Sequence, residues 1–170
     1  TSKDGAYRGN TSYNVSASIG GTIVSGVGTV TDENDRPKIS ISSASAREGD
    51  NLVFYVYLDK NTLVDTIMPY RLEHITTSPA DIGDETFTKG VVYDVFTGNI
   101  TVPKGVRAFE VIIPTVSDTD KEGLETLRII IDGTIGVGNI SSIIEDENDE
   151  NIDCDSNAIV STSAVEIDTH

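Results

Sequence analysis

The sequence has no tryptophan, one cysteine and one methionine among its 170 residues. A single cysteine excludes an internal disulfide, so an extracellular form of the chain needs another brace, such as bound metal. No apolar run approaches the ~20 residues of a transmembrane helix, which predicts no membrane insertion. Basic residues are few: the chain has 12 lysines and arginines and 28 aspartates and glutamates, which gives a formal net charge of −16. A field of that sign repels nucleic acid and favours cations.

Residues suited to catalysis are also scarce. The two histidines are His74 and His170, and no serine, histidine and aspartate arrangement can be built around them. No glycine-rich phosphate loop opens a helical pattern. These absences predict that the protein is not an enzyme.

The sequence does contain the period-two alternation of β-strands. Within 51–59, every second residue from Leu52 to Leu58 is apolar, which predicts one buried face. Further strands are predicted at 12–18, 26–32, 38–43, 66–73, 98–105, 106–116, 125–133 and 139–146. Pro69 suggests an edge strand or a bulge. About seven short strands predict an all-β, Ig-like antiparallel β-sandwich, with additional strands from the N- and C-terminal segments.

Two acidic tags, TDENDR and EDENDE, mark an internal repeat. At an offset of 114 residues, 4–35 fall on 118–149 without gaps, and the apolar alternation stays in phase. A period of this length suits a whole β-domain. The predicted division is 1–36, the C-terminal strands of a preceding incomplete module; 37–150, a complete module; and 151–170, a terminal segment and candidate donor strand.

Acidic residues gather where the predicted strands end, in AREGD, ADIGDE, SDTDKEGLE and EDEND. Loops of a sandwich cluster at its two ends, so several of these groups can meet. Crowded carboxylates raise one another's pKa values, and a hard divalent cation removes that penalty; Ca²⁺ fits flexible loops better than Mg²⁺. The DTDKEG stretch alone is not an EF-hand, because Ile129 stands where the twelfth-position glutamate belongs.

Taken together, SISSASAREGD, ADIGDE, GNITVPKG and the closing IIEDEND resemble the Calx-β motif, a β-sandwich module found in tandem in bacterial RTX-type surface adhesins. The resemblance covers about 37–149 in full. By position it implies a set of Ca²⁺ ligands: Glu48, Asp84, Asp118, Asp146 and Asp149, with Asp81, Asp120 and Glu125 as further candidates. The sequence departs from the family pattern in a longer 85–97 stretch. In the partial first copy, Arg8 and Thr11 stand where the second has Glu122 and Glu125, which predicts a weaker site there.

Three functions remain open at this stage. The first is a calcium-stabilised structural or adhesive module at the cell surface, packed against adjacent copies of itself. The second is a filament subunit joined by β-strand complementation through its N- and C-terminal segments. The third is a domain that binds a surface peptide or glycan through the 85–97 stretch and an outward aromatic patch of Tyr55, Tyr57 and Tyr70.

Overall fold

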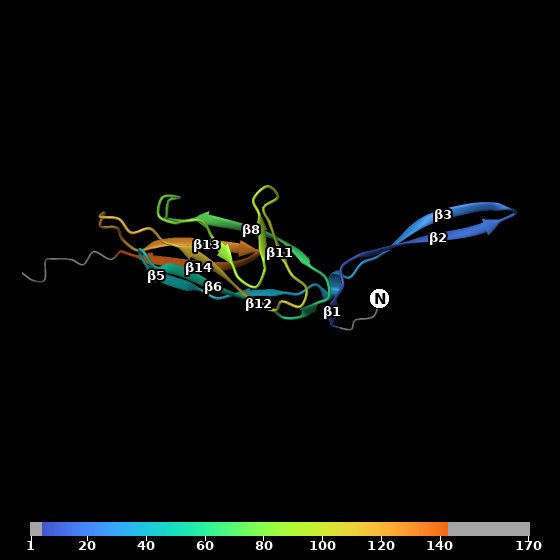
Figure 1. The fold of residues 1–170 in the computed structure, drawn as a ribbon, viewed down its shortest axis with the longest axis horizontal. Helices are drawn as coiled ribbons and strands as arrows, with labels where there is room; N and C mark the ends of the chain where they lie inside the picture. The colour runs from blue at the N-terminus through green and yellow to red at the C-terminus, as the bar shows by residue number, and fades with distance from the viewer. Residues whose placement is uncertain (1–4, 143–170) are drawn as a thin grey trace, which may run out of the picture.

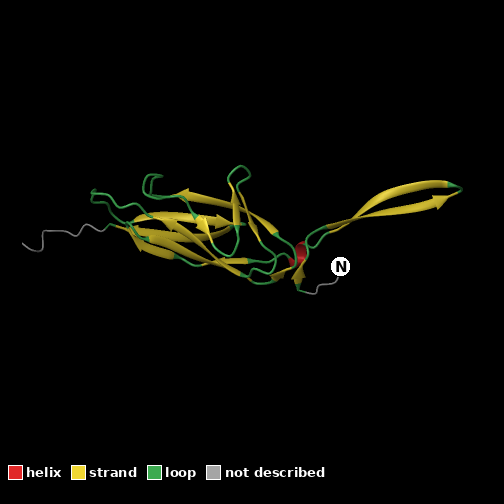
Figure 2. Ribbon diagram, viewed as in Figure 1, coloured by secondary structure: helices red, strands yellow, loops and turns green. Residues whose placement is uncertain are grey.

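The computed structural model describes residues 5–142, which form a β-sandwich and a separate hairpin (Figure 1). Among these residues there is no α-helix, and the one helical turn is the 3₁₀ segment η1 (Glu33–Asp35) (Figure 2). No helix in this part of the chain has the length and apolar character to cross a membrane. The predicted all-β sandwich is confirmed.

Two sheets make the sandwich, one in the order β10-β11-β8-β13-β14-β5 and the other in the order β4-β6-β12-β9. The strands of the sandwich region, with the short β7 between them, are β4 (Ile39–Ile41), β5 (Ala44–Arg47), β6 (Asn51–Leu58), β7 (Asn61–Thr62), β8 (Thr66–His74), β9 (Thr86–Phe87), β10 (Val92–Asp94), β11 (Asn99–Val102), β12 (Ala108–Pro114), β13 (Glu125–Ile131) and β14 (Thr134–Ser141). Pairing within the sheets is antiparallel except between β5 and β14, which run parallel. The segment predicted as one strand at 38–43 is split, because the chain crosses at 42–43 from the smaller sheet to the larger.

The core lies between the two sheets and follows the alternation read from the sequence. Leu52, Phe54, Val56 and Leu58 of β6 are all buried, as predicted. They pack with alternate residues of β12 and β13 on both sides of the interior, such as Val111. Burying an aliphatic or aromatic side chain of this size contributes about 1.5–3 kcal/mol, so this aliphatic core is the main source of stability.

The closing strand begins earlier than predicted. Asp132 (φ 48°) and Gly133 (φ 83°) form a two-residue turn between β13 and β14, so residues 134–138 are strand rather than loop. An Asp-Gly pair with positive φ at both positions is typical of the tightest hairpins. Gly138 then lies under Phe54, where an added Cβ would be 2.7 Å from the ring carbon Cζ. The last part of the predicted strand, 143–146, lies outside the described residues.

Pro69 lies on a central strand, so the edge-strand prediction is wrong. β8 is flanked by β11 and β13 in the larger sheet. The pairing of β8 with β13 ends at Tyr70, and the Pro69 carbonyl accepts a hydrogen bond from the Asp132 N–H at the turn (2.9 Å). The proline therefore stands just past the ladder with β13, while it still pairs with Asn99 of β11, so its missing N–H costs the β8–β13 pairing no hydrogen bond.

The N-terminal segment forms a hairpin of its own, made by β2 (Thr11–Ile19) and β3 (Thr22–Val30). It projects from one end of the sandwich, and the described chain leaves the sandwich near the opposite end (Figure 1). Before it, β1 (Ala6–Tyr7) pairs in parallel with β7 at the base of the sandwich. The assignment of 1–36 to a preceding module stays a prediction.

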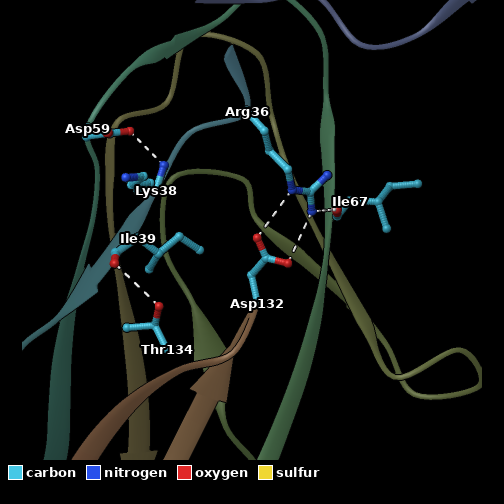
Figure 3. Close-up of polar contacts among 7 residues, drawn as sticks. All are labelled: Arg36, Lys38, Ile39, Asp59, Ile67, Asp132 and Thr134. Atoms are coloured by element: carbon cyan, nitrogen blue, oxygen red, sulfur yellow. Dashed lines mark hydrogen bonds and ion pairs between the residues drawn. The ribbon is translucent and has the colours of Figure 1, made fainter. Parts of the chain in front are cut away.

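The acidic tag TDENDR forms the junction between hairpin and sandwich. Asp35, only 3% exposed, lies 3.4 Å from the Lys60 ammonium. Arg36 donates to both carboxylate oxygens of Asp132 (3.3 Å each) and to the Ile67 carbonyl (3.1 Å) (Figure 3). These charge-assisted contacts, together with the β1–β7 pair, fix the base of the hairpin to the sandwich.

Candidate metal centre

The acidic loops meet at the end of the sandwich far from the hairpin. They are the β5–β6 turn, the 75–85 loop and the 116–124 loop (Figure 1). Carboxylate oxygens of Asp81, Glu122 and Glu125 lie within 4.8 Å of one another, and so do those of Asp118, Asp120 and Glu122. Glu122 belongs to both groups and makes them one cluster of five carboxylates.

Glu48 adds a sixth carboxylate at this end of the sandwich. Its side chain is 7% exposed, and its Oε2 atom has no hydrogen-bond partner among the described residues. The buried Oε2 atom of Glu125 also lacks one. A buried carboxylate oxygen without a partner destabilises the folded state, because it loses its hydrogen bonds to water and gains none in the protein. A hard cation is the group that compensates such oxygens.

The charges of the cluster act on one another. Burial, followed by the charges of Asp81, Glu122 and Glu48, raises the pKa of Glu125 to about 7. Desolvation raises the pKa of Glu122 as well, with added repulsion from Asp118, Asp81, Glu48 and Asp120. Glu122 and Glu125 are therefore harder to ionise next to their acidic neighbours, and a bound cation would relieve this repulsion.

The structure brings together five of the predicted ligands: Glu48, Asp81, Asp118, Asp120 and Glu125. Asp84 is exposed and belongs to neither carboxylate group of the described residues. Asp146 and Asp149 lie outside the described residues. The sequence prediction omitted Glu122, although the D-x-D-x-E spacing of 118–122 already placed it beside Asp118 and Asp120. It is the residue that joins the two groups.

Local hydrogen bonds hold the acidic loops in place. Asp118 Oδ1 accepts the Asp120 N–H (2.8 Å), and Asp81 Oδ2 accepts the Ser78 N–H. The Glu48 N–H donates to the Ser141 carbonyl (3.0 Å). The site is therefore tied to the last described residues of β14, at the point where the chain leaves the sandwich.

The carboxylates of the first tag have other partners. Asp32 accepts the Arg8 N–H (2.6 Å), and the Asp32 N–H donates to Asn10 (3.0 Å). Asp35 is held by Lys60. These two carboxylates of the first tag thus serve as structural acceptors at the junction, while Asp4 lies outside the described residues.

The predicted aromatic patch is only partly formed. Tyr55 and Tyr57 are exposed and line a groove of about 360 Å³ on the outer face of the smaller sheet, beside Lys89 and Glu110. Including Tyr70 in this patch was wrong. It is 3% exposed and makes edge-to-face contacts with Phe87 (5.2 Å) and Tyr93 (4.9 Å). The Tyr70 ring belongs to the core because β8 is a central strand whose even-numbered residues face inward as far as position 70.

Comparison with known proteins yields structures but no family. No family model and no curated protein matches the chain. A structure of domains 4 and 5 of the S-layer protein SbsC is 13% identical, with a TM-score of 0.37, covering 79% of this chain and 58% of that one. A structure of SbsC domains 4–9 is also 13% identical, with a TM-score of 0.37, and the match covers 81% of this chain and 18% of that one. A structure of CaCohA2 from Clostridium acetobutylicum is 17% identical, with a TM-score of 0.31, and the match covers 63% of this chain and 90% of that one. The chain thus spans less than two thirds of either SbsC chain, and the Calx-β resemblance stays a prediction.

Proposed function

We propose that the protein is a calcium-stabilised structural or adhesive β-sandwich module of the cell surface. The observation that supports this most directly is the buried, unpartnered Oε2 atom of Glu48 beside five other carboxylates. Six carboxylates at one end of a sandwich repel one another unless a cation neutralises them. The cell-surface location rests on the resemblance to Calx-β modules of surface proteins.

The position of the site suggests what the ion does. The carboxylates come from three separate loops, so one bound Ca²⁺ would hold these loops together in place of disulfides. The site is also joined to Ser141, next to the exit of the chain toward EDENDE. Asp146 and Asp149 of that segment are then available as further ligands. A bound ion would stiffen the connection to an adjacent module or copy.

Titration calorimetry and thermal unfolding in Ca²⁺ and in EDTA test this function. At a free concentration ~100-fold above its Kd, Ca²⁺ should stabilise the protein by about 2.7 kcal/mol. Glu48→Gln should weaken Ca²⁺ binding, whereas Asp84→Asn removes the same charge from an exposed side chain outside the cluster and should leave it unchanged. An absence of binding heat, together with equal melting temperatures in Ca²⁺ and EDTA, would exclude the proposal.

A second candidate function is supported by the groove at Tyr55 and Tyr57. Tyrosines present an apolar ring and a polar hydroxyl, and a charged pair such as Lys89 and Glu110 can orient a ligand. This combination suits a peptide or glycan. Peptide and glycan arrays test it directly. Binding of a peptide or glycan that is lost in the Tyr55→Ala variant would support this function. An absence of binding to every peptide and glycan on the arrays would exclude it.

A further inference from the structure

Within the part of the chain that the structure describes, no other segment covers the β2–β3 hairpin. All of residues 11–30 except Gly28 are exposed. None of these twenty residues is charged, although the protein carries a net charge of −16. A lone two-stranded hairpin is at best marginally stable in water, so these observations indicate a surface that something else covers.

One face of the hairpin is apolar and the other is polar. Residues that pair across two antiparallel strands lie on the same face. Tyr13 pairs with Gly28, Val15 with Gly26 and Ala17 with Val24, and this set is called the apolar face. The residues between them are mostly serine, threonine and asparagine, with Ile23 and Val27 as the two large apolar exceptions, and form the opposite face.

The sandwich contains a buried copy of this face. In β13–β14, Leu127 pairs with Gly138 and Ile129 pairs with Gly136, so large apolar residues again lie opposite two glycines. Both glycines lie directly beneath side chains of the other sheet, among them Phe54. The glycines of β14 are thus explained by the close packing of the other sheet, which leaves no room for a side chain at these positions.

Among the described residues, Gly26 of the hairpin has no such explanation. A Cβ at this position would meet no atom within 4 Å among the described residues. Gly28 differs, because the Tyr13 ring covers it. Glycine weakens a strand and marks the places where another chain segment comes close to the backbone. The space above Gly26 and Val15 is therefore suited to side chains from outside the described molecule.

We propose that the apolar face is a docking surface for a second copy of this chain, whose residues 157–167 cover it. The hairpin projects from one end of the sandwich, and the described chain ends just after β14, near the other end (Figure 1). Copies aligned head to tail therefore bring the segment that follows residue 142 of one copy to the hairpin of the next. Residues 143–170 reach up to ~90 Å when extended, at about 3.3 Å per residue.

The composition of the two segments favours this pairing. Residues 157–167, NAIVSTSAVEI, combine short apolar runs with small polar residues and contain one charged residue, Glu166. Two molecules of charge −16 repel each other over most of their surfaces. An uncharged hairpin and an almost uncharged strand are the parts that can meet without bringing carboxylates together. The docked strand would add a covering layer like the one that β6 supplies to β14.

Sedimentation velocity of the full chain over a range of concentrations tests the proposal. Val15→Glu and Gly26→Val should each weaken self-association by at least about tenfold, which corresponds to ~1.4 kcal/mol. Gly26→Val keeps the hairpin intact, because valine favours strands and the space at this position is open. Ser16→Glu is the matched control, since it places the same charge one residue away on the opposite face.

The identity of the covering segment is tested by deleting residues 151–170. The proposal requires that this deletion weaken self-association as much as Val15→Glu does. It is overturned if the wild-type chain stays monomeric, if Ser16→Glu is as damaging as Val15→Glu, or if the deletion has no effect. Because the apolar face lies far from the acidic cluster, association should persist in EDTA. A failed calcium site and a failed docking surface therefore give different results.

Discussion

The stability of the calcium-free protein is expected to fall as the pH rises from about 5 to about 7.5. Burial and the neighbouring charges of Asp81, Glu122 and Glu48 raise the pKa of Glu125 from 4.5 to about 7 in the folded protein. Between these two values, the folded protein keeps a proton that the unfolded chain has released. Each rise in pH across this window therefore favours unfolding.

The size of the effect follows from the pKa shift. A change from 4.5 to about 7 corresponds to ~3 kcal/mol for a carboxyl fully shielded from water. Glu125 is only partly buried, so solvent screening reduces this to about 1–2 kcal/mol. For a domain of this size, that is a fall of about 4–10 °C in Tm between the two ends of the pH window.

Urea unfolding at several pH values in EDTA, followed by circular dichroism, measures this dependence. Glu125→Gln should flatten the curve and raise the stability near neutral pH, because the amide keeps the shape without the charge. Asp84→Asn changes the net charge equally from outside the cluster and should keep the wild-type slope. Added Ca²⁺ should reverse the trend, because the ion binds carboxylates only after they lose their protons.

Two results would refute this reasoning. One is calcium-free stability that is constant or increases across the window. The other is an Asp84→Asn variant that loses its pH dependence as fully as Glu125→Gln does. The second result would show that overall charge, rather than the cluster, sets the slope.

Three further outcomes are expected. Gly138→Val should destabilise the sandwich by about 1–3 kcal/mol in urea unfolding, because its side chain would collide with Phe54; an unchanged midpoint would contradict the close packing. Lys60→Met should cost about 1–3 kcal/mol by leaving Asp35 buried without its cation, and hydrogen exchange should show the loss at the η1 junction first. Phe54→Ala should cost about 3–5 kcal/mol, because the ring is fully buried in the core; a loss below 1 kcal/mol would argue against that packing.

Several local features could be predicted without a structure. The burial of Leu52, Phe54, Val56 and Leu58 follows from period-two alternation, which depends only on residues two positions apart. The gathering of carboxylates in loops follows from the ends of the predicted strands. Prediction failed where a local pattern had two meanings. The Gly-rich 134–138 stretch is absent from the predicted strands, because only the packing of Phe54 against β14 explains glycines inside a strand.

The position of each strand in its sheet required the tertiary structure. Pro69 suggests an edge strand when the sequence is considered alone. In the structure β8 is central, and it accommodates the proline because Pro69 lies just beyond the ladder with β13. The burial of Tyr70 follows from the same placement. The spacing of 118–122 already placed Glu122 beside Asp118 and Asp120, but its proximity to Asp81 depends on the meeting of two loops.

The sequence by itself determined the all-β class, the acidic character and the repeat of TDENDR and EDENDE, because composition and periodicity are properties of the chain. Only the tertiary structure decided what the first tag does. Asp35 is buried against Lys60, and Arg36 pairs with Asp132, 96 residues away. Tertiary structure also decided which carboxylates share one site and that no other part of residues 5–142 covers the hairpin face. These features depend on contacts between distant segments, and such contacts are set by how two sheets pack.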